Sequence, residues 1–350
     1  MTSRAGNRRR ETTLVDVARA AGVSRQTVSN AINAPHLLRP ETLAAVRTAI
    51  KQMGYQPNRS ARSLRTRRSR LIGYHVPQPG DDRLSWVLDR FLHAVADAAR
   101  RVGYHLVVFT PESPDQELDA YASMLRTRSV DGFLLTDVRA DDPRALWLHR
   151  RGVPFAAYGR LPAPAGTAWV DVDGAAGTAR AVEHLVELGH RRIAFLGWPE
   201  GDRLGDERLR GWRSAMTRYG LPHESLLART DDTISAATAA AGHLLDADTP
   251  PTAVIGVSDT VAVGALRAAR SRDRRPGRDL AVVGFDDTPS AALLTPALTS
   301  VSQPLEEAAR LLVAMLVGQL EGNPPERQPV LLEPTLVVRE SSCPPPVATG

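Results

Sequence analysis

The sequence is poor in cysteine and lysine, and it has no long hydrophobic run. Its 350 residues include a single cysteine, Cys343, which excludes an internal disulfide framework and a zinc site built from several cysteines. No apolar stretch is long enough to cross a bilayer. The first ten residues are polar and rich in arginine, so they lack the apolar segment of a secretory signal. These absences favour a cytoplasmic protein.

Basic residues are concentrated at one end of the chain. Up to Arg70 there are 15 Lys or Arg residues against 3 Asp or Glu, a net charge of +12, so the remainder carries −7 of the total of +5. Positive charge on a short segment favours nucleic-acid binding, with a solvated basic tail as the alternative. The length exceeds the roughly 100 to 200 residues of one domain, which indicates two or three folding units.

The basic segment begins with a helix and a tight turn. Apolar residues over 14–21 recur with the spacing of a helix that buries one face, and Thr13 with Asp16 forms a capping pair at its start. Gly22 can supply a positive φ in the turn that follows, and Ser24 can cap the next helix.

Two further helices complete the predicted head. The second covers 25–32, and the third runs from Pro40 to Gly54. Two short helices joined by a three-residue turn with glycine are typical of a DNA-reading helix-turn-helix, although a basic structural bundle is an alternative. Exposed Arg, Gln and Asn side chains on the second helix favour DNA, because they can pair with guanine or adenine in the major groove.

The motif TLVDVARAAGVSRQTVSN at 13–30 and the motif GYQPNRSARSL at 54–64 resemble the LacI/GalR family of bacterial transcriptional regulators. The resemblance runs from Thr13 to Ser341. It departs at Arg39, where the family usually has a Ser or Thr cap. It implies roles for three groups of residues in the head. These are base reading by Arg25, Gln26 and Asn30, phosphate contact by Thr13, Ser24, Thr27, Ser29 and Asn33, and minor-groove entry by a hinge helix with Asn58, Ala61 and Leu64.

The rest of the chain alternates short apolar runs with helical stretches. This βαβ rhythm, in two successive sets from Leu71 onward, predicts two α/β lobes with parallel sheets. Ligands of such sheets lie beyond the carboxyl ends of the strands. The resemblance implies a type I periplasmic-binding-protein-like body, with three crossovers between the lobes and a small-molecule effector between them.

Six short motifs carry the resemblance in the body: DVDG at 171, LGHRRI at 188, RLRGW at 208, VSD at 257, GFDDT at 284 and LTSVSQ at 298. By position, they imply Arg208, Asp286 and Gln303 as leading effector ligands, with Ser258 and Phe285 behind them. A structural cap or ion pair is the alternative for these residues.

Some cleft positions depart from the family or match it poorly. Ser258 stands where sugar-responsive members commonly have Asn, which leaves room for water or for a different ligand. The loop 76–86 matches poorly, so Trp86, as a sugar-stacking face, and Asp89 are further candidates. Arg160, after Tyr158 and Gly159, is another.

The sequence predicts a regulator and not an enzyme. It has no nucleophile elbow, phosphate-binding loop, dinucleotide motif or paired metal histidines, so no cofactor or metal is expected. We expect a homodimer at the nucleoid on a pseudo-palindromic operator, most simply a repressor controlled by a sugar or oligosaccharide. A corepressor-dependent or partner-dependent regulator, or a free solute-binding protein, are the alternatives.

These assignments divide the chain into a head, a hinge, a body and two tails. We predict a disordered basic tail at 1–12, a DNA-binding domain at 13–56, a hinge and linker at 57–70, an effector-binding and dimerisation domain at 71–341, and a disordered tail at 342–350. Within the body, the N-lobe is expected at about 71–172 and 302–330, and the C-lobe at about 173–301 and 331–341.

Overall fold

A computed structural model describes residues 12–55, 68–76, 86–111, 113, 116–139, 141–161, 167–323 and 329–342. The chain forms two compact units, of which the first ends at Ser69 and the second begins at Arg70. Among the described residues, no helix is both long and apolar enough to span a bilayer.

The first unit, the head, is a small helical domain around one apolar core. Its elements are α1 (Leu14–Ala20), α2 (Arg25–Asn33), the 3-10 helix η1 (Pro35–Leu37) and α3 (Pro40–Met53). Val17, Val28 and Val46, one from each α-helix, are fully buried and pack together. The predicted three-helix head with its helix-turn-helix is therefore confirmed.

Local signals fix the helix ends in the head. Thr13 and Asp16 form the predicted capping box, because Asp16 N donates to Thr13 Oγ1 over 3.4 Å and Thr13 N donates to Asp16 Oδ2 over 2.9 Å. Gly22 takes a φ of +66°, as the turn requires, and Ser24 caps α2. At α3, Arg39 occupies the cap position and its side chain makes no capping hydrogen bond.

Substituting Thr13→Ala should loosen α1 within the otherwise intact protein. The lost cap costs about 1 kcal/mol, so amide hydrogen exchange across α1 should become roughly fivefold faster. Exchange measured by mass spectrometry on the full chain tests this. Thr48→Ala makes the same chemical change at an exposed position inside α3 and should not accelerate exchange. Equal exchange rates of α1 in both variants would show that the capping box contributes nothing.

The second unit, the body, contains two six-stranded sheets, one in each lobe. The N-lobe sheet has the strand order β11 (Val330–Leu332), β5 (Ala168–Val172), β4 (Phe155–Tyr158), β3 (Gly132–Leu135), β1 (Leu71–His75) and β2 (His105–Phe109). The C-lobe sheet has the order β12 (Thr335–Val337), β10 (Thr299–Ser302), β9 (Ala281–Phe285), β8 (Ala253–Gly256), β6 (Ile193–Gly197) and β7 (Leu227–Arg229).

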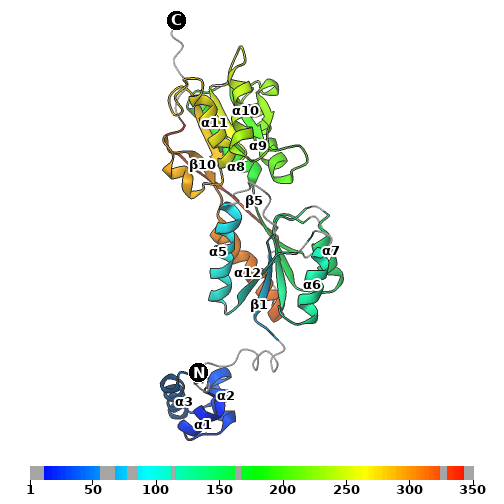
Figure 1. The fold of residues 1–350 in the computed structure, drawn as a ribbon, viewed down its shortest axis with the longest axis vertical. Coiled ribbons are helices and arrows are strands. Elements are labelled where there is room, and N and C mark those ends of the chain that lie inside the picture. The colour runs from blue at the N-terminus through cyan, green and yellow to red at the C-terminus, as the bar shows by residue number, and fades with distance from the viewer. Residues whose placement is uncertain are drawn as a thin grey trace, which may run out of the picture. The chain divides into compact units, whose positions relative to one another are not determined.

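Helices cover both faces of the N-lobe sheet. They are α5 (Trp86–Arg101), α6 (Glu117–Arg126), α7 (Pro143–Arg150) and α12 (Leu305–Glu321). Figure 1 shows α5 and α12 on one side of β1, and α6 and α7 on the other. Each side has its own apolar core, one with Phe91 and Leu312 and one with Tyr121 and Leu148.

The C-lobe has one large apolar core around Phe195 and Trp212. Its helices are α8 (Gly174–Glu187), α9 (Arg203–Arg218), η3 (Glu224–Leu226), α10 (Ile234–Leu245), α11 (Asp259–Arg270) and η4 (Pro289–Leu293). The predicted two-lobed α/β body is confirmed.

Among the strands that the structure describes, every pair is parallel except one. Strand β12 runs antiparallel to β10, which the prediction of parallel sheets did not include. The reason is topological: β12 enters the C-lobe directly from the N-lobe, at the edge where the other C-lobe strands end.

Three crossovers connect the lobes, and two of them lie one or two residues later in the chain than the predicted lobe boundaries. Ser302 still pairs in the C-lobe sheet, and Leu331 and Leu332 still pair with β5 in the N-lobe. The connections therefore lie near 173, at 303–304 and at 333–334.

Candidate functional site

The second helix of the head exposes the side chains that were predicted to read bases. Arg25 and Gln26 are exposed and Asn30 is half-buried, whereas Val28 and Ala31 face the core. The Nε2 atom of Gln26 donates to Oδ1 of Asn30 over 2.9 Å. The helix thus has one polar face with Arg, Gln and Asn side chains, the residue types that pair with base edges in the major groove.

Hydroxyl and amide groups lie at the starts of α1 and α2 and along the polar face of α2. Ser24 Oγ lies 2.9 Å from Thr27 Oγ1, and Asn33 Nδ2 donates to the backbone oxygen of Ser29 over 2.7 Å. Thr13 Oγ1 already donates to Asp16 Oδ2 over 2.6 Å, so this hydroxyl would have to turn away to donate to a phosphate. Backbone amides and hydroxyl groups at the N-terminus of a helix are suitable donors to phosphate oxygens.

The predicted hinge residues Asn58, Ala61 and Leu64 lie outside the described residues.

Arg208 is buried and makes two polar contacts within the C-lobe. It projects from α9, and its Nη1 donates to the backbone oxygen of Val257 over 2.5 Å. Its Nη2 donates over 3.2 Å to Oδ1 of Asp286, the residue that directly follows β9. The guanidinium lies 3.7 Å from the ring centre of Phe285 and 5.4 Å from that of Trp198, so aromatic faces flank the charge.

A chain of hydrogen bonds extends from Arg208 into the N-lobe. Gln303, at the crossover after β10, donates through Nε2 to Asp286 Oδ1 over 2.7 Å. The hydroxyl of Tyr158, at the end of β4, donates to Gln303 Oε1 over 3.1 Å. Phe91 stacks on the Tyr158 ring with centroids 4.2 Å apart. The structure therefore brings together the three leading candidates and adds Tyr158.

The surroundings of the Asp286 carboxyl shift its pKa in opposite directions. Burial raises its pKa, and the Arg208 guanidinium and the Gln303 amide lower it, which leaves a pKa of about 6. Asp286 also has a φ of +105°, a backbone conformation that is strained for a residue other than glycine. Strained residues held by their surroundings are often functional.

Ser258 has a structural task in addition to any effector contact. Its Oγ caps α11 by accepting from Val261 N over 3.2 Å, and it donates to Oδ1 of Asp232 over 2.6 Å. Phe285 is buried beneath the Arg208 guanidinium.

The remaining candidates lie apart from this chain of hydrogen bonds. Trp86, at the start of α5, is 47% exposed, and Asp89 is exposed near His93. Within the described part of the chain, no hydrogen bond or ion pair joins either of them to Arg208. Arg160 instead forms ion pairs with Asp171 and Glu207.

Sequence reasoning missed Tyr158, Trp198 and the ion-pair partners of Arg160. One signal was available, because Tyr158 ends a strand just before Gly159, and ligand sites of parallel sheets lie at such ends.

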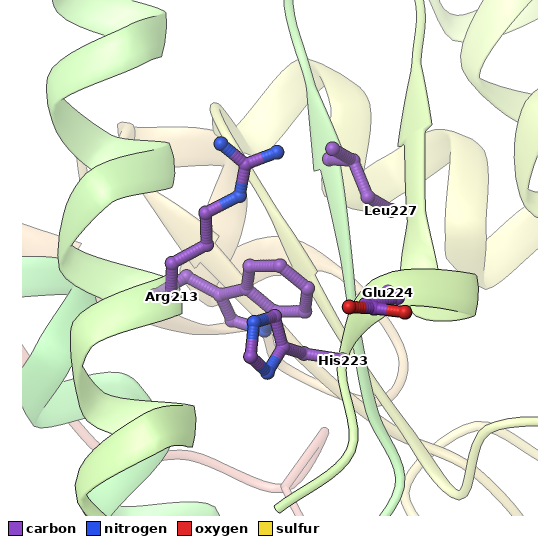
Figure 2. A pocket seen from close by; sticks show the side chains of 5 residues that line it. Arg213, His223, Glu224 and Leu227 are labelled. Carbon is purple, nitrogen blue, oxygen red and sulfur yellow. The ribbon is translucent and has the colours of Figure 1, made fainter.

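One recess lies on the outer part of the C-lobe, between α9, η3 and β7. Its volume is about 310 Å³, and its lining consists of Trp212, Arg213, His223, Glu224 and Leu227. The His223 ring meets the Trp212 indole edge-on, with centroids 5.7 Å apart, and Figure 2 shows Arg213, His223, Glu224 and Leu227 around the recess. None of the predicted site residues lines this recess. In the described parts of the chain, no three His, Cys, Asp or Glu residues are grouped so that they could hold a metal ion.

Two stretches of the chain match known families. Residues 13–58 match the bacterial regulatory proteins of the lacI family, and residues 182–342 match the periplasmic binding protein-like domain. The HTH-type transcriptional regulator CelR of Thermobifida fusca is 37% identical over 341 residues, which are 95% of this chain and 99% of CelR.

Solved structures of regulators share the fold. The structure of a CelR–cellobiose complex is 35% identical with a TM-score of 0.69, and the lac repressor dimer bound to operator and the anti-inducer ONPF is 28% identical with a TM-score of 0.78. Both alignments cover 95% of this chain and 100% of the other. The helix-turn-helix head, the two-lobed body and a near full-length relative at 37% identity together show that the chain belongs to the LacI family of bacterial regulatory proteins.

Proposed function

We propose that this DNA-binding transcriptional regulator is a repressor whose hold on its operator is controlled by a sugar bound between the lobes. The observation that carries the proposal is the chain of hydrogen bonds from Arg208 through Asp286 and Gln303 to Tyr158. It joins both lobes, so a ligand that replaces these bonds changes how the lobes are held together.

The chemistry of these groups supports a ligand rich in hydroxyls. A hydroxyl can donate to the Asp286 carboxylate and accept from the Arg208 guanidinium, so neighbouring sugar hydroxyls can substitute for the bonds that the two side chains now make with each other. The relative CelR has been solved with cellobiose, which supports a sugar or oligosaccharide. Ser258, Phe285, Arg160, Trp86 and Asp89 are proposed as further effector-site residues.

On the DNA side, the proposal assigns base reading to Arg25, Gln26 and Asn30. Phosphate contacts are assigned to the hydroxyl and amide groups of Thr13, Ser24, Thr27, Ser29 and Asn33. The proposed minor-groove wedge, Leu64, rests on the hinge motif of the sequence. Two heads require a homodimer on a pseudo-palindromic operator, for which the lac repressor dimer on its operator is a precedent. The protein then works in the cytoplasm at the nucleoid and catalyses no reaction.

Binding of genomic fragments to the purified protein tests the proposal, repeated with a panel of mono- and oligosaccharides. We expect enrichment of a pseudo-palindrome and its release by one sugar. Enrichment that no sugar changes would contradict sugar control and favour a corepressor or a protein partner. Absence of any enriched sequence would contradict operator binding itself.

Operator affinity should fall steeply with salt, because the segment up to Arg70 carries a net charge of +12. The logarithm of the association constant should fall linearly with that of the salt concentration, at a slope of about −0.9 for each phosphate neutralised. Fluorescence anisotropy with labelled operator between 50 and 300 mM salt, roughly the range where the effect is large, measures it. A flat profile would contradict a role for the basic residues.

A further inference from the structure

Four charged residues form a second set of contacts between the lobes, beside the hydrogen bonds around Arg208. We call them the ionic cluster: Arg160 and Asp171 of the N-lobe, and Arg203 and Glu207 of the C-lobe. Each lobe contributes one cation and one anion. Arg160 is also among the proposed effector-site residues, whereas Asp171, Arg203 and Glu207 are not, and these three make no hydrogen bond to Asp286 or Gln303 in the described part of the chain.

Two of the four ion pairs cross from lobe to lobe. Arg160 Nη2 contacts Glu207 Oε1 across the junction, and Arg203 Nη1 lies 3.2 Å from Asp171 Oδ2. The other two stay within a lobe. Arg160 Nε lies 3.1 Å from Asp171 Oδ2, and Arg203 Nη1 lies 3.6 Å from Glu207 Oε2, one helical turn along α9.

The carboxylates of the ionic cluster are almost completely buried, and the guanidinium groups are not. Asp171 and Glu207 side chains are 5% and 4% exposed, whereas those of Arg160 and Arg203 are 33% and 32% exposed. A buried carboxylate needs a charged partner, since its desolvation is expensive. Burial accordingly raises the pKa of Glu207, and the nearby Arg160 guanidinium lowers it. Interactions in such a low-dielectric position are stronger than those at a surface.

Opening the lobes would break only half of the cluster. Asp171 would lose Arg203 and keep Arg160, and Glu207 would lose Arg160 and keep Arg203. Neither carboxylate would be left without a cation. The cluster therefore favours the closed arrangement without preventing the lobes from separating, as a reversible switch requires.

A glycine precedes Arg160 where side chains from both lobes lie close to the backbone. Gly159 precedes Arg160 and has a φ of +114°, which other residues rarely adopt. A Cβ atom there would lie 3.2 Å from Nη2 of Arg203 and 2.7 Å from Cγ2 of Val138. The absence of a side chain at Gly159 therefore leaves room for Val138 of the same lobe and for the end of the Arg203 side chain of the opposite lobe.

We propose that the ionic cluster is a latch whose four residues position the two lobes against each other and stabilise the closed arrangement when no effector is bound. The strength of the latch sets the ratio of closed to open molecules. The apparent affinity for a ligand that prefers one arrangement depends on the fraction of molecules already in that arrangement. The latch holds the lobes whether or not an effector exists, whereas its consequence for the effector response rests on the proposed function.

Charge reversal distinguishes a latch from a general packing role. In Arg160→Glu and in Glu207→Arg, the closest pair between the lobes becomes repulsive. In the double variant, both N-lobe positions are negative and both C-lobe positions are positive, so every pair between the lobes is attractive. Each single variant should raise the ratio of open to closed molecules about tenfold, within the range of typical coupling energies. The double variant should return to the wild-type ratio or become more closed.

Single-molecule energy transfer on the full chain, without sugar or DNA, measures that ratio. Dyes are attached at Arg150→Cys on α7 and Ser235→Cys on α10, two exposed positions in different lobes, in a Cys343→Ser background. Excess unlabelled protein ensures that a dimer carries only one labelled chain. Arg275→Glu is the matched control, because it reverses a charge in an exposed ion pair with Asp279 inside the C-lobe. It should leave the ratio unchanged.

Three results would overturn the latch: single reversals that leave the ratio unchanged, a double variant that remains open, or an equal shift in the control. Wild-type protein provides a second measurement that does not depend on how the variants fold. Raising sodium chloride toward 1 M should open the lobes progressively, since screening weakens the partly exposed pairs, and an unchanged ratio would contradict the latch. This measurement uses neither sugar nor operator, so it is independent of the proposed function. A protein that does not respond to sugars can still have the latch, and a protein without the latch can still respond to a sugar.

Discussion

Replacing Arg208 by alanine should abolish the response to the sugar effector while leaving operator binding unchanged. The substitution removes the donor to Val257 and Asp286 and leaves the Asp286 carboxyl buried without its cation. A hydrogen bond to a charged group contributes about 1.5 to 3 kcal/mol, so each bond that Arg208 is proposed to make with the sugar should cost about 10- to 150-fold in effector affinity when it is lost. Both bonds of Arg208 stay within the C-lobe, so the Tyr158–Gln303 bond that reaches the N-lobe is kept, and the head retains its own core. Isothermal titration with the sugar and anisotropy with the operator measure the two affinities.

Two further variants separate recognition from folding. Arg210→Ala removes the same charge from an exposed position two residues along α9 and should keep the full response. Arg208→Ala combined with Asp286→Asn removes the unpaired charge, so it should recover thermal stability without recovering the response. Normal release from the operator by the sugar in Arg208→Ala would place the effector site elsewhere.

The head could be predicted closely from sequence because its structure is set by local signals. The capping box of Thr13 and Asp16, the positive φ of Gly22 and the helix end at Gly54 each depend on residues within four positions of one another. Such signals are present in the chain itself and do not require knowledge of the rest of the fold.

The site between the lobes was predicted less completely, because it depends on contacts between distant residues. Tyr158 meets Gln303 across 145 positions, and Arg160 meets Glu207 across 47. Resemblance to the family suggested Arg208, Asp286 and Gln303 one by one, and the structure shows that they share one chain of hydrogen bonds. Nothing local in the sequence marks Asp171 or Glu207 as buried partners of arginine. The direction of β12 was likewise set by the last crossover and not by its residues.

Replacing Arg25 by alanine should selectively weaken binding to the operator. Arg25 is exposed at the first position of α2, on the same polar face as Gln26 and Asn30. A well-oriented arginine pairing with guanine contributes about 1 to 3 kcal/mol of discrimination, so operator affinity should fall by about 5- to 150-fold. Affinity for unrelated DNA depends on total charge and should fall only slightly. Anisotropy with operator and scrambled duplexes at one salt concentration gives both values.

The matched control is Arg47→Ala, which removes the same charge from the exposed face of α3 in the same head. Both variants lower the charge of the head by one, so they should lose affinity for scrambled DNA equally. Only Arg25→Ala should lose the preference for the operator, because only α2 is proposed to lie in the major groove. If both variants lost the same operator affinity, Arg25 would contribute only its charge. Another element of the head would then have to read the sequence.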